Sequence, residues 1–281
     1  MKLILGTAQF RGDYGASPGE VLSFSEAGIE ELLRTASELG ISEFDTSPIY
    51  GSAEALLGKY VGNASVHSKI EPGVDCAASL TRSIDRIGLN RLSVVYFHEE
   101  LTLSRRDEES IATLAAMAGE KFERLGASIY ETDELNRLGN RAELSAFQVP
   151  YNVADRRFDS ERLETYRSEG RLFFGRSALL QGVLVRPADV APPTGNALKT
   201  FLGLFHEVCA CHQVSPLEGA IVFARANSAL DGLILGARSS SDLRQINDAF
   251  FFTAPQKLLE DLSMLTPPSW ADVDPRRWGS A

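Results

Sequence analysis

Four ionisable side chains in the first third of the chain could act together on a carbonyl group. They are Asp45, Tyr50, Lys69 and His98. An ammonium beside a phenol favours the phenolate and lowers the pKa of the phenol, so Lys69 is expected to acidify Tyr50. A carboxylate such as Asp45 would hold and compensate that ammonium in a partly dry site. This set is suited to protonating a carbonyl oxygen while another group attacks the carbon, with His98 orienting the carbonyl or relaying a proton.

The attack on carbon requires a partner, because no protein side chain donates a hydride. A nicotinamide cofactor would supply it. The chain carries no convincing metal site. His206, Cys209, Cys211 and His212 stand close together, but their spacing is not that of a zinc or haem motif, so no metal is expected.

The four side chains stand at or just after the ends of short, bounded apolar runs that read as buried strands. Eight such runs alternate with helical stretches along the sequence, which predicts a parallel sheet with helices outside. An open dinucleotide-binding sheet should carry G-x-G-x-x-G after its first strand, and no such motif occurs. The sequence therefore predicts a (β/α)8 TIM barrel of the α/β class, in which strand ends converge on one face. We expect one domain over residues 1–281, with 252–281 as a C-terminal surface tail.

The composition of the chain indicates which kinds of molecule the protein can bind. The chain has 281 residues and a formal net charge of −10, which disfavours nucleic acid and anionic membrane surfaces. Its three cysteines suggest no disulfide framework. The apolar run at the N-terminus is too short for a signal peptide, and no run approaches the ~18 apolar residues of a membrane span. We expect a cytoplasmic protein that acts on a small molecule.

Motifs in a fixed order along almost the whole chain resemble those of the aldo-keto reductase family. The matching stretches are Leu5–Phe10, Phe44–Glu54, Ser68–Lys69, Tyr96–His98, Phe147–Asn152, Arg176–Gly182, Gly236–Ser239 and Asp274–Trp278. The resemblance implies an NAD(P)-dependent oxidoreductase that reduces an aldehyde or ketone to an alcohol. It implies that Tyr50 is the general acid, tuned by Lys69 and Asp45, with His98 helping to bind the carbonyl.

The same resemblance implies a set of cofactor-binding residues. Ser128 and Gln148 match residues that hold the nicotinamide carboxamide, and Arg176 stands where the family usually places an aromatic ring, so its planar guanidinium would stack there. Ser177, Leu179 and Gly182 would line the pyrophosphate region, and the Gly236–Ser239 turn would hold the adenosine phosphate. The full set is Gly6, Thr7, Ser128, Gln148, Arg176, Ser177, Leu179, Gly182, Gly236, Ala237, Arg238, Ser239, Asp242 and Gln245.

Two positions depart from the family pattern. Ile129 stands where many relatives have Asn, and Asp242 stands where relatives that select the 2′-phosphate of NADP place a basic residue, although Arg238 and Arg244 flank it. The family habit makes NADP(H) the expected cofactor rather than NAD(H). Asp242 argues in the other direction.

The substrate and two rival functions remain open at this level. Arg11, Asp13 and Tyr14 suggest a hydroxylated, sugar-like carbonyl substrate. In one rival, Lys69 forms a Schiff base as the nucleophile of a lyase, with Tyr50 as its acid–base partner. In the other, the chain binds a nucleotide as a regulatory subunit without catalysing a reaction.

Overall fold

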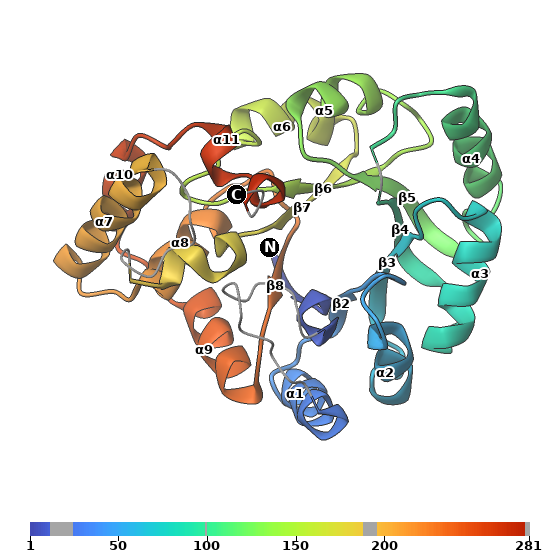
Figure 1. Ribbon diagram of the computed structural model, residues 1–281, viewed down its shortest axis with the longest axis horizontal. Helices are drawn as coiled ribbons and strands as arrows, with labels where there is room; N and C mark the ends of the chain where they lie inside the picture. Colours follow the sequence, from blue (N-terminus) through green and yellow to red (C-terminus); the bar gives the residue numbers. More distant parts are fainter. Residues whose placement is uncertain (12–24, 99, 188–195, 279–281) are drawn as a thin grey trace.

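Eight parallel strands close into a barrel in which each strand pairs with the next and β8 pairs with β1. The computed structural model describes residues 1–11, 25–98, 100–187 and 196–278. Figure 1 shows the strands forming the inner ring, with helices outside them. The strands are β1 (Lys2–Gly6), β2 (Glu43–Asp45), β3 (Ser65–Ile70), β4 (Leu92–Phe97), β5 (Phe122–Ser128), β6 (Ala146–Pro150), β7 (Leu172–Arg176) and β8 (Gly232–Gly236). The predicted TIM barrel is confirmed.

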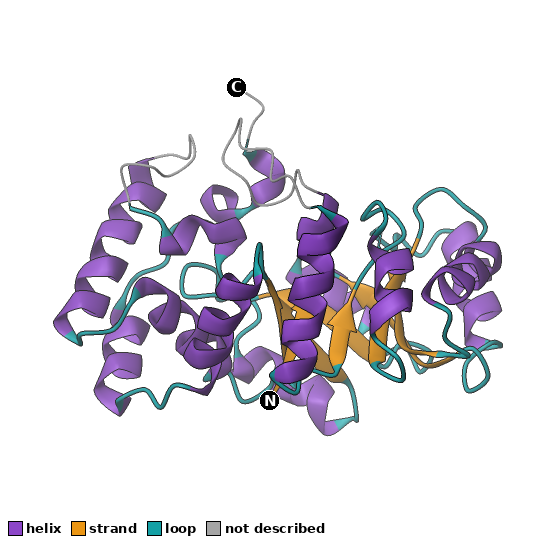
Figure 2. Ribbon diagram, turned by 90° about the horizontal axis from the view of Figure 1, so that it is seen from below, coloured by secondary structure: helices purple, strands orange, loops and turns teal. Residues whose placement is uncertain are grey.

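Helices connect the strands and cover the outside of the sheet, as the side view in Figure 2 shows. They are α1 (Glu26–Glu38), α2 (Ala53–Tyr60), α3 (Cys76–Ile87), α4 (Arg105–Ala115), α5 (Thr132–Leu138), α6 (Ser160–Ser168), α7 (Asn196–Cys211), α8 (Pro216–Arg225), α9 (Ser240–Phe251), α10 (Gln256–Met264) and α11 (Trp270–Val273). Short 3₁₀ turns are η1 (Ala8–Arg11), η2 (Leu180–Val185) and η4 (Pro275–Arg277).

Residues 252–278, expected as a surface tail, contain two helices that the sequence pattern did not reveal. Helix α10 lies alongside α7 (Figure 1) and also contacts α8. It buries Leu258 and Leu262, and Val273 at the end of α11 is buried too. This segment is therefore packed onto the barrel through apolar contacts.

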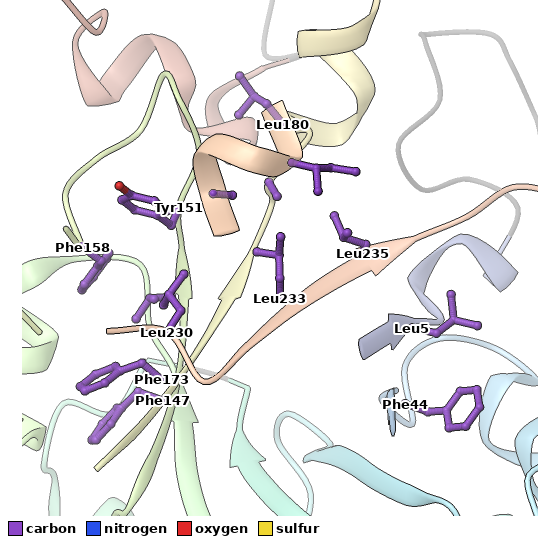
Figure 3. Close-up of a cluster of buried hydrophobic side chains, with 14 of the residues drawn as sticks. Leu5, Phe44, Phe147, Tyr151, Phe158, Phe173, Leu180, Leu230, Leu233 and Leu235 are labelled. Atoms are coloured by element: carbon purple, nitrogen blue, oxygen red, sulfur yellow. The ribbon is translucent and has the colours of Figure 1, made fainter. Parts of the chain in front are cut away.

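The apolar core has two parts, separated by the sheet. The larger part lies between the strands and the outer helices, and Figure 3 shows a portion of it, where Phe147 and Phe173 lie side by side. Their rings stack with centroids 5.7 Å apart. A smaller cluster fills the barrel interior around Tyr96 and Phe174. His67 lies in this interior with Nδ1 3.3 Å from the Tyr96 hydroxyl, and burial lowers the pKa of His67 to about 4, so the ring is neutral.

Gly126 on β5 marks a close approach inside the barrel. A Cβ there would lie 2.0 Å from the carbonyl oxygen of Ala146 and 2.9 Å from a ring carbon of Tyr96. Backbone cannot yield as a flexible side chain does, so we expect Gly126→Ala to lower the free energy of unfolding by about 1–3 kcal/mol or to prevent folding. Gly203→Ala on α7 is the control, because a Cβ there has no neighbour within 4 Å. Urea unfolding midpoints compare the two, and equal midpoints would contradict the prediction.

Candidate active site

A cavity of about 600 Å³ opens at the C-terminal ends of the strands. This is the face on which barrel enzymes carry their chemistry, and the volume is typical of a ligand-binding pocket. Asp45, Tyr50, Lys69 and His98 all line it. The strand ends of β2, β3 and β4 thus bring together the four side chains that the sequence predicted would converge.

Lys69 and Asp45 form a buried ion pair on neighbouring strands. The Lys69 Nζ atom donates to Asp45 Oδ2 at 2.7 Å and to the Thr46 carbonyl oxygen at 2.9 Å. The Asp45 carboxylate also accepts a hydrogen bond from the Gln148 side-chain amide. The side chains of Lys69 and Asp45 are only 2% and 6% exposed. The ammonium therefore has a fixed position, because its charge has specific partners in a dry environment.

Tyr50 follows β2 in a turn closed by its own N–H, which donates to the Ser47 carbonyl oxygen at 3.0 Å. The Lys69 ammonium nitrogen lies 5.2 Å from the centroid of the Tyr50 ring. The prediction of an acidified Tyr50 is wrong for the free protein, because the net shift of the Tyr50 pKa is upward even with the Lys69 ammonium nearby. Burial raises the pKa of Tyr50, the Asp45 charge raises it further, and Arg176 and Arg11 only partly oppose this. Tyr50 is therefore a neutral phenol that still carries its proton.

His98 follows β4 and faces the same space. Its Nδ1 lies 3.3 Å from the Ser47 hydroxyl, and its ring meets the Tyr50 ring edge-on with centroids 6.2 Å apart. Burial, with the charges of Lys69 and Arg176, lowers the pKa of His98 to about 3. A neutral imidazole can donate one hydrogen bond to a carbonyl oxygen, so His98 can orient a carbonyl without carrying charge.

Most of the predicted cofactor residues line the same cavity. They are Gly6, Ser128, Gln148, Arg176, Ser177, Leu179, Gly182, Gly236, Arg238, Asp242 and Gln245. Three others are engaged elsewhere and do not line it. Thr7 is fully buried and bonds to the Thr46 hydroxyl at 2.9 Å, and Ala237 is buried as well. Ser239 is the N-cap of α9, where its hydroxyl accepts from the Asp242 backbone N–H at 3.0 Å.

The loop after β7 has an unusual backbone. Ser177, Leu180 and Gln181 have positive φ values of 60°, 48° and 54°, and Gly182 has 87°. Positive φ is uncommon outside glycine and concentrates at functional sites. Alternation of this conformation with ordinary backbone can turn N–H groups into an anion-binding concavity. Ser177, Leu179, Gln181 and Gly182 of this loop line the cavity.

Arg176, at the end of β7, points its guanidinium into this region. Its Nη2 donates to the Ile129 carbonyl oxygen at 3.0 Å, and its central carbon lies 4.0 Å from the Tyr130 ring centroid. Its Nε is buried without a hydrogen-bond partner among the residues described. A planar cation held in this way offers a stacking surface to a flat ring. Ile129, which departs from the family pattern, is buried and contributes its backbone carbonyl here.

Two paired charges line the cavity at the start of α9. Arg238 Nε donates to Asp242 Oδ2 at 2.8 Å, and Gln245 follows one turn later on α9. The guanidinium that could attract a 2′-phosphate is therefore already paired with a carboxylate.

Sequence reasoning missed several lining residues. Tyr130 lies two residues beyond the end of β5 and lines the cavity, as does the start of α8, residues 215–217. The capping pattern Ser215-Pro216-Leu217-Glu218 marks a helix start but not where that start points. Arg11 lines the cavity, whereas Asp13 and Tyr14 lie outside the described residues.

The histidine–cysteine stretch at the end of α7 does not line the cavity. His206 Nε2 lies 2.8 Å from the Leu184 carbonyl oxygen, and His212 Nε2 lies 2.8 Å from Asp261 Oδ2. Within the described part of the chain, no cluster of three or more His, Cys, Asp or Glu side chains could hold a metal ion. No helix in that same part is long and apolar enough to cross a membrane.

Comparison with known proteins places this site in context. The model of the Aldo/keto reductase family matches residues 2–265. The chain is 25% identical over 290 aligned positions to a protein of Leptosphaeria maculans named oxidoreductase sirO, with 86% of each chain covered. A solved structure, aldo-keto reductase AKR11C1 from Bacillus halodurans in its apo form, superposes with a TM-score of 0.72 at 19% identity. That match covers 87% of this chain and 88% of the other, and it supports the barrel fold.

Proposed function

Because the chain belongs to the aldo/keto reductase family, we propose that it is an NAD(P)H-dependent oxidoreductase that reduces an aldehyde or ketone to an alcohol. The observation that carries the proposal is the convergence of four side chains in one cavity. Lys69 is paired with Asp45 at 2.7 Å, its ammonium lies 5.2 Å from the Tyr50 ring centroid, and His98 shares the space. This arrangement can deliver a proton to a carbonyl oxygen at a fixed place.

The proton step follows from the charges around Tyr50. Tyr50 is neutral in the free protein, which is the state that a general acid needs. When its proton passes to the carbonyl oxygen, negative charge develops on the phenol oxygen. The buried Lys69 ammonium lies close enough to stabilise that charge, and Asp45 keeps it in position. His98, neutral, orients the carbonyl by a hydrogen bond.

A bound nicotinamide cofactor supplies the hydride. Ser128 and Gln148 would hold its carboxamide, and Arg176 would stack on its ring, because all three line the cavity near Tyr50. The loop from Ser177 to Gly182 would bind the pyrophosphate. Polar groups near Tyr50, Arg11 among them, favour a hydroxylated, sugar-like carbonyl substrate.

The pH dependence tests the protonation states. His98 has its pKa lowered to about 3 and Tyr50 has its pKa raised above its ordinary value, so neither changes charge near neutral pH. We expect kcat/KM for carbonyl reduction to be flat between about pH 5 and about pH 9. Steady-state rates across that range provide the check. A limb with a midpoint near the ordinary histidine value of about 6.5 would contradict the assignment of a neutral His98.

Cofactor choice is tested by titrating the protein into NADPH and NADH and following nicotinamide fluorescence. We propose that NADP(H) is preferred, with Arg238 reaching the 2′-phosphate and Asp242 limiting the preference. Asp242→Asn removes a carboxylate that competes for Arg238. It is expected to strengthen NADPH binding by roughly three- to tenfold and to leave NADH within twofold. Equal effects on both cofactors would contradict this role of Asp242, and no binding of either would contradict the proposed function.

A further inference from the structure

Tyr130 lies between two guanidinium groups from segments far apart in the sequence, β7 and η4. The central carbon of Arg176, at the end of β7, is 4.0 Å from the Tyr130 ring centroid, and that of Arg276, near the C-terminus, is 3.8 Å away. Two planar groups cannot both sit over the centre of one ring face, so they lie on opposite faces. The ring is thus enclosed in a stack of two cation–π contacts.

The two arginines differ in which cavities they line. Arg176 lines the main cavity, whereas Arg276 lies outside it. Both line a smaller neighbouring cavity of about 190 Å³, together with Tyr130, Ser177 and Gln181. Tyr130 and Arg176 therefore line both cavities, whereas Arg276 lines the smaller one.

Two carboxylates, those of Asp274 and Glu131, hold the guanidinium of Arg276. Asp274, only 2% exposed, accepts from Arg276 Nε at 2.9 Å and from Nη2 at 2.6 Å. Glu131 accepts from Arg276 Nη2 at 3.1 Å and from Arg157 Nη1 at 3.1 Å. These pairs join η4 to the loops after β5 and β6. Arg276 is consequently held in one orientation, with its flat face available to the Tyr130 ring.

The backbone at Tyr130 is fixed as well. The N–H groups of Tyr130 and Glu131 both donate to the buried Glu134 carboxylate at 2.7 Å. Because the backbone is anchored, the orientation of the Tyr130 ring depends on the side chains that pack against its two faces. Arg276 covers one of them, and Arg176 packs against the other.

We propose that Arg276 is a positioning residue for the nicotinamide end of the cofactor site, acting through Tyr130 on Arg176. The inference rests on the proposed function, because Arg176 is assigned there to stack on the nicotinamide ring. The C-terminal segment, which the sequence presented as a surface tail, thereby becomes part of the active-site wall. Loss of the Arg276 contact frees the Tyr130 ring. Arg176 stays bonded to the Ile129 carbonyl oxygen but loses the ring that supports one face of its guanidinium.

The test compares Arg276→Ala with Arg277→Ala. Arg277 is a matched control because it is the next residue, is also exposed and also stacks on an aromatic ring, that of Trp270, at 4.2 Å. The probes are whichever of NADPH and NADH the wild-type protein binds more tightly, and ADP-ribose with or without its 2′-phosphate to match, which lacks the nicotinamide. We expect Arg276→Ala to weaken cofactor binding by about five- to tenfold, the scale of a lost stacking contact, and to leave ADP-ribose binding within twofold. Arg277→Ala should change neither.

A second pair of variants separates ring stacking from simple loss of structure. Tyr130→Leu should behave like Arg276→Ala, whereas Tyr130→Phe, which keeps the ring, should bind the cofactor more tightly than Tyr130→Leu. Both tryptophans of the chain, Trp270 and Trp278, lie in the C-terminal segment, so their emission reports whether that segment stays packed.

The inference is overturned if Arg276→Ala binds the cofactor as Arg277→Ala does, or if it loses affinity equally for cofactor and ADP-ribose. It is also overturned if Tyr130→Leu binds like Tyr130→Phe. A wild-type protein that binds neither NADPH nor NADH would instead refute the proposed function, a result that is distinct from these.

Discussion

Tyr50→Phe is expected to lower kcat for carbonyl reduction by about 10²–10⁴-fold, the usual contribution of a positioned general acid. The substitution removes one hydroxyl and leaves the ring, so the edge-on contact with His98 and the turn closed by the Tyr50 N–H should persist. Cofactor affinity should therefore remain within about twofold of wild type, because the loss falls on a group that acts in the transition state. Steady-state kinetics and nicotinamide fluorescence measure the two quantities separately.

A suitable control is Tyr60→Phe. Tyr60 is the last residue of α2 and is 38% exposed, and it does not line the main cavity. Its substitution should leave kcat unchanged. If Tyr50→Phe retains activity within a few fold of wild type, Tyr50 is not the proton donor and the assigned chemistry fails.

Lys69→Met is expected to affect both stability and turnover. Removing the ammonium leaves the Asp45 carboxylate buried with only the Gln148 amide and without its ionic partner. Breaking one side of a buried ion pair typically costs about 3–5 kcal/mol of folding free energy. Turnover should also collapse, because the charge that stabilises the Tyr50 phenolate is gone. Urea unfolding and kcat at saturating substrate measure the two effects.

The double variant Asp45→Asn/Lys69→Met separates these effects. It replaces both charges with neutral groups of similar volume, and such replacements of buried ion pairs are often neutral for stability. We expect most of the lost stability to return while activity stays low. Recovery of activity together with stability would show that the Lys69 charge has no part in the chemistry.

The contacts of Lys69 also bear on the rival lyase function. A Schiff-base lysine must present an unprotonated amine to the substrate carbon. Here Nζ donates to two oxygen atoms and the side chain is 2% exposed. Borohydride treatment with a carbonyl substrate and no nicotinamide should therefore leave Lys69 unmodified. A regulatory subunit without turnover would bind NADPH tightly yet fail to oxidise it across a broad panel of aldehydes and ketones.

The sequence predicted the barrel and its four central side chains because both depend on local signals. Short apolar runs mark the strands, and Asp45, Lys69 and His98 stand at or beside the strand ends, which a closed barrel must bring to one face. The stretch Arg176–Gly182, which the family resemblance implies as a cofactor-binding loop, is also contiguous, and Arg176, Ser177 and Gly182 line the cavity. Residues that are neighbours in sequence near a strand end stay neighbours in the fold, so their common position can be predicted from the sequence.

What depends on burial or on distant contacts could not be predicted. The direction of the Tyr50 pKa shift follows from how deeply the ring is enclosed and from Asp45 lying nearby, neither of which is written in the spacing. Helix α10 was missed, because the proline residues around it suggested an irregular tail. The contact of Arg276 with Tyr130 joins segments far apart in the sequence. Thr7 and Ala237 are buried and Ser239 caps α9, so none of the three lines the cavity.

The most direct test of the central claim follows the hydrogen that reaches the carbonyl carbon. NADPH carrying deuterium at the transferable position of its nicotinamide ring is mixed with the protein and an accepted aldehyde or ketone, and the alcohol is analysed by mass spectrometry. We predict one deuterium on the former carbonyl carbon, and none on that carbon when ordinary NADPH is used in deuterated water. Solvent deuterium on the carbon, or product formed without a nicotinamide, would contradict the account.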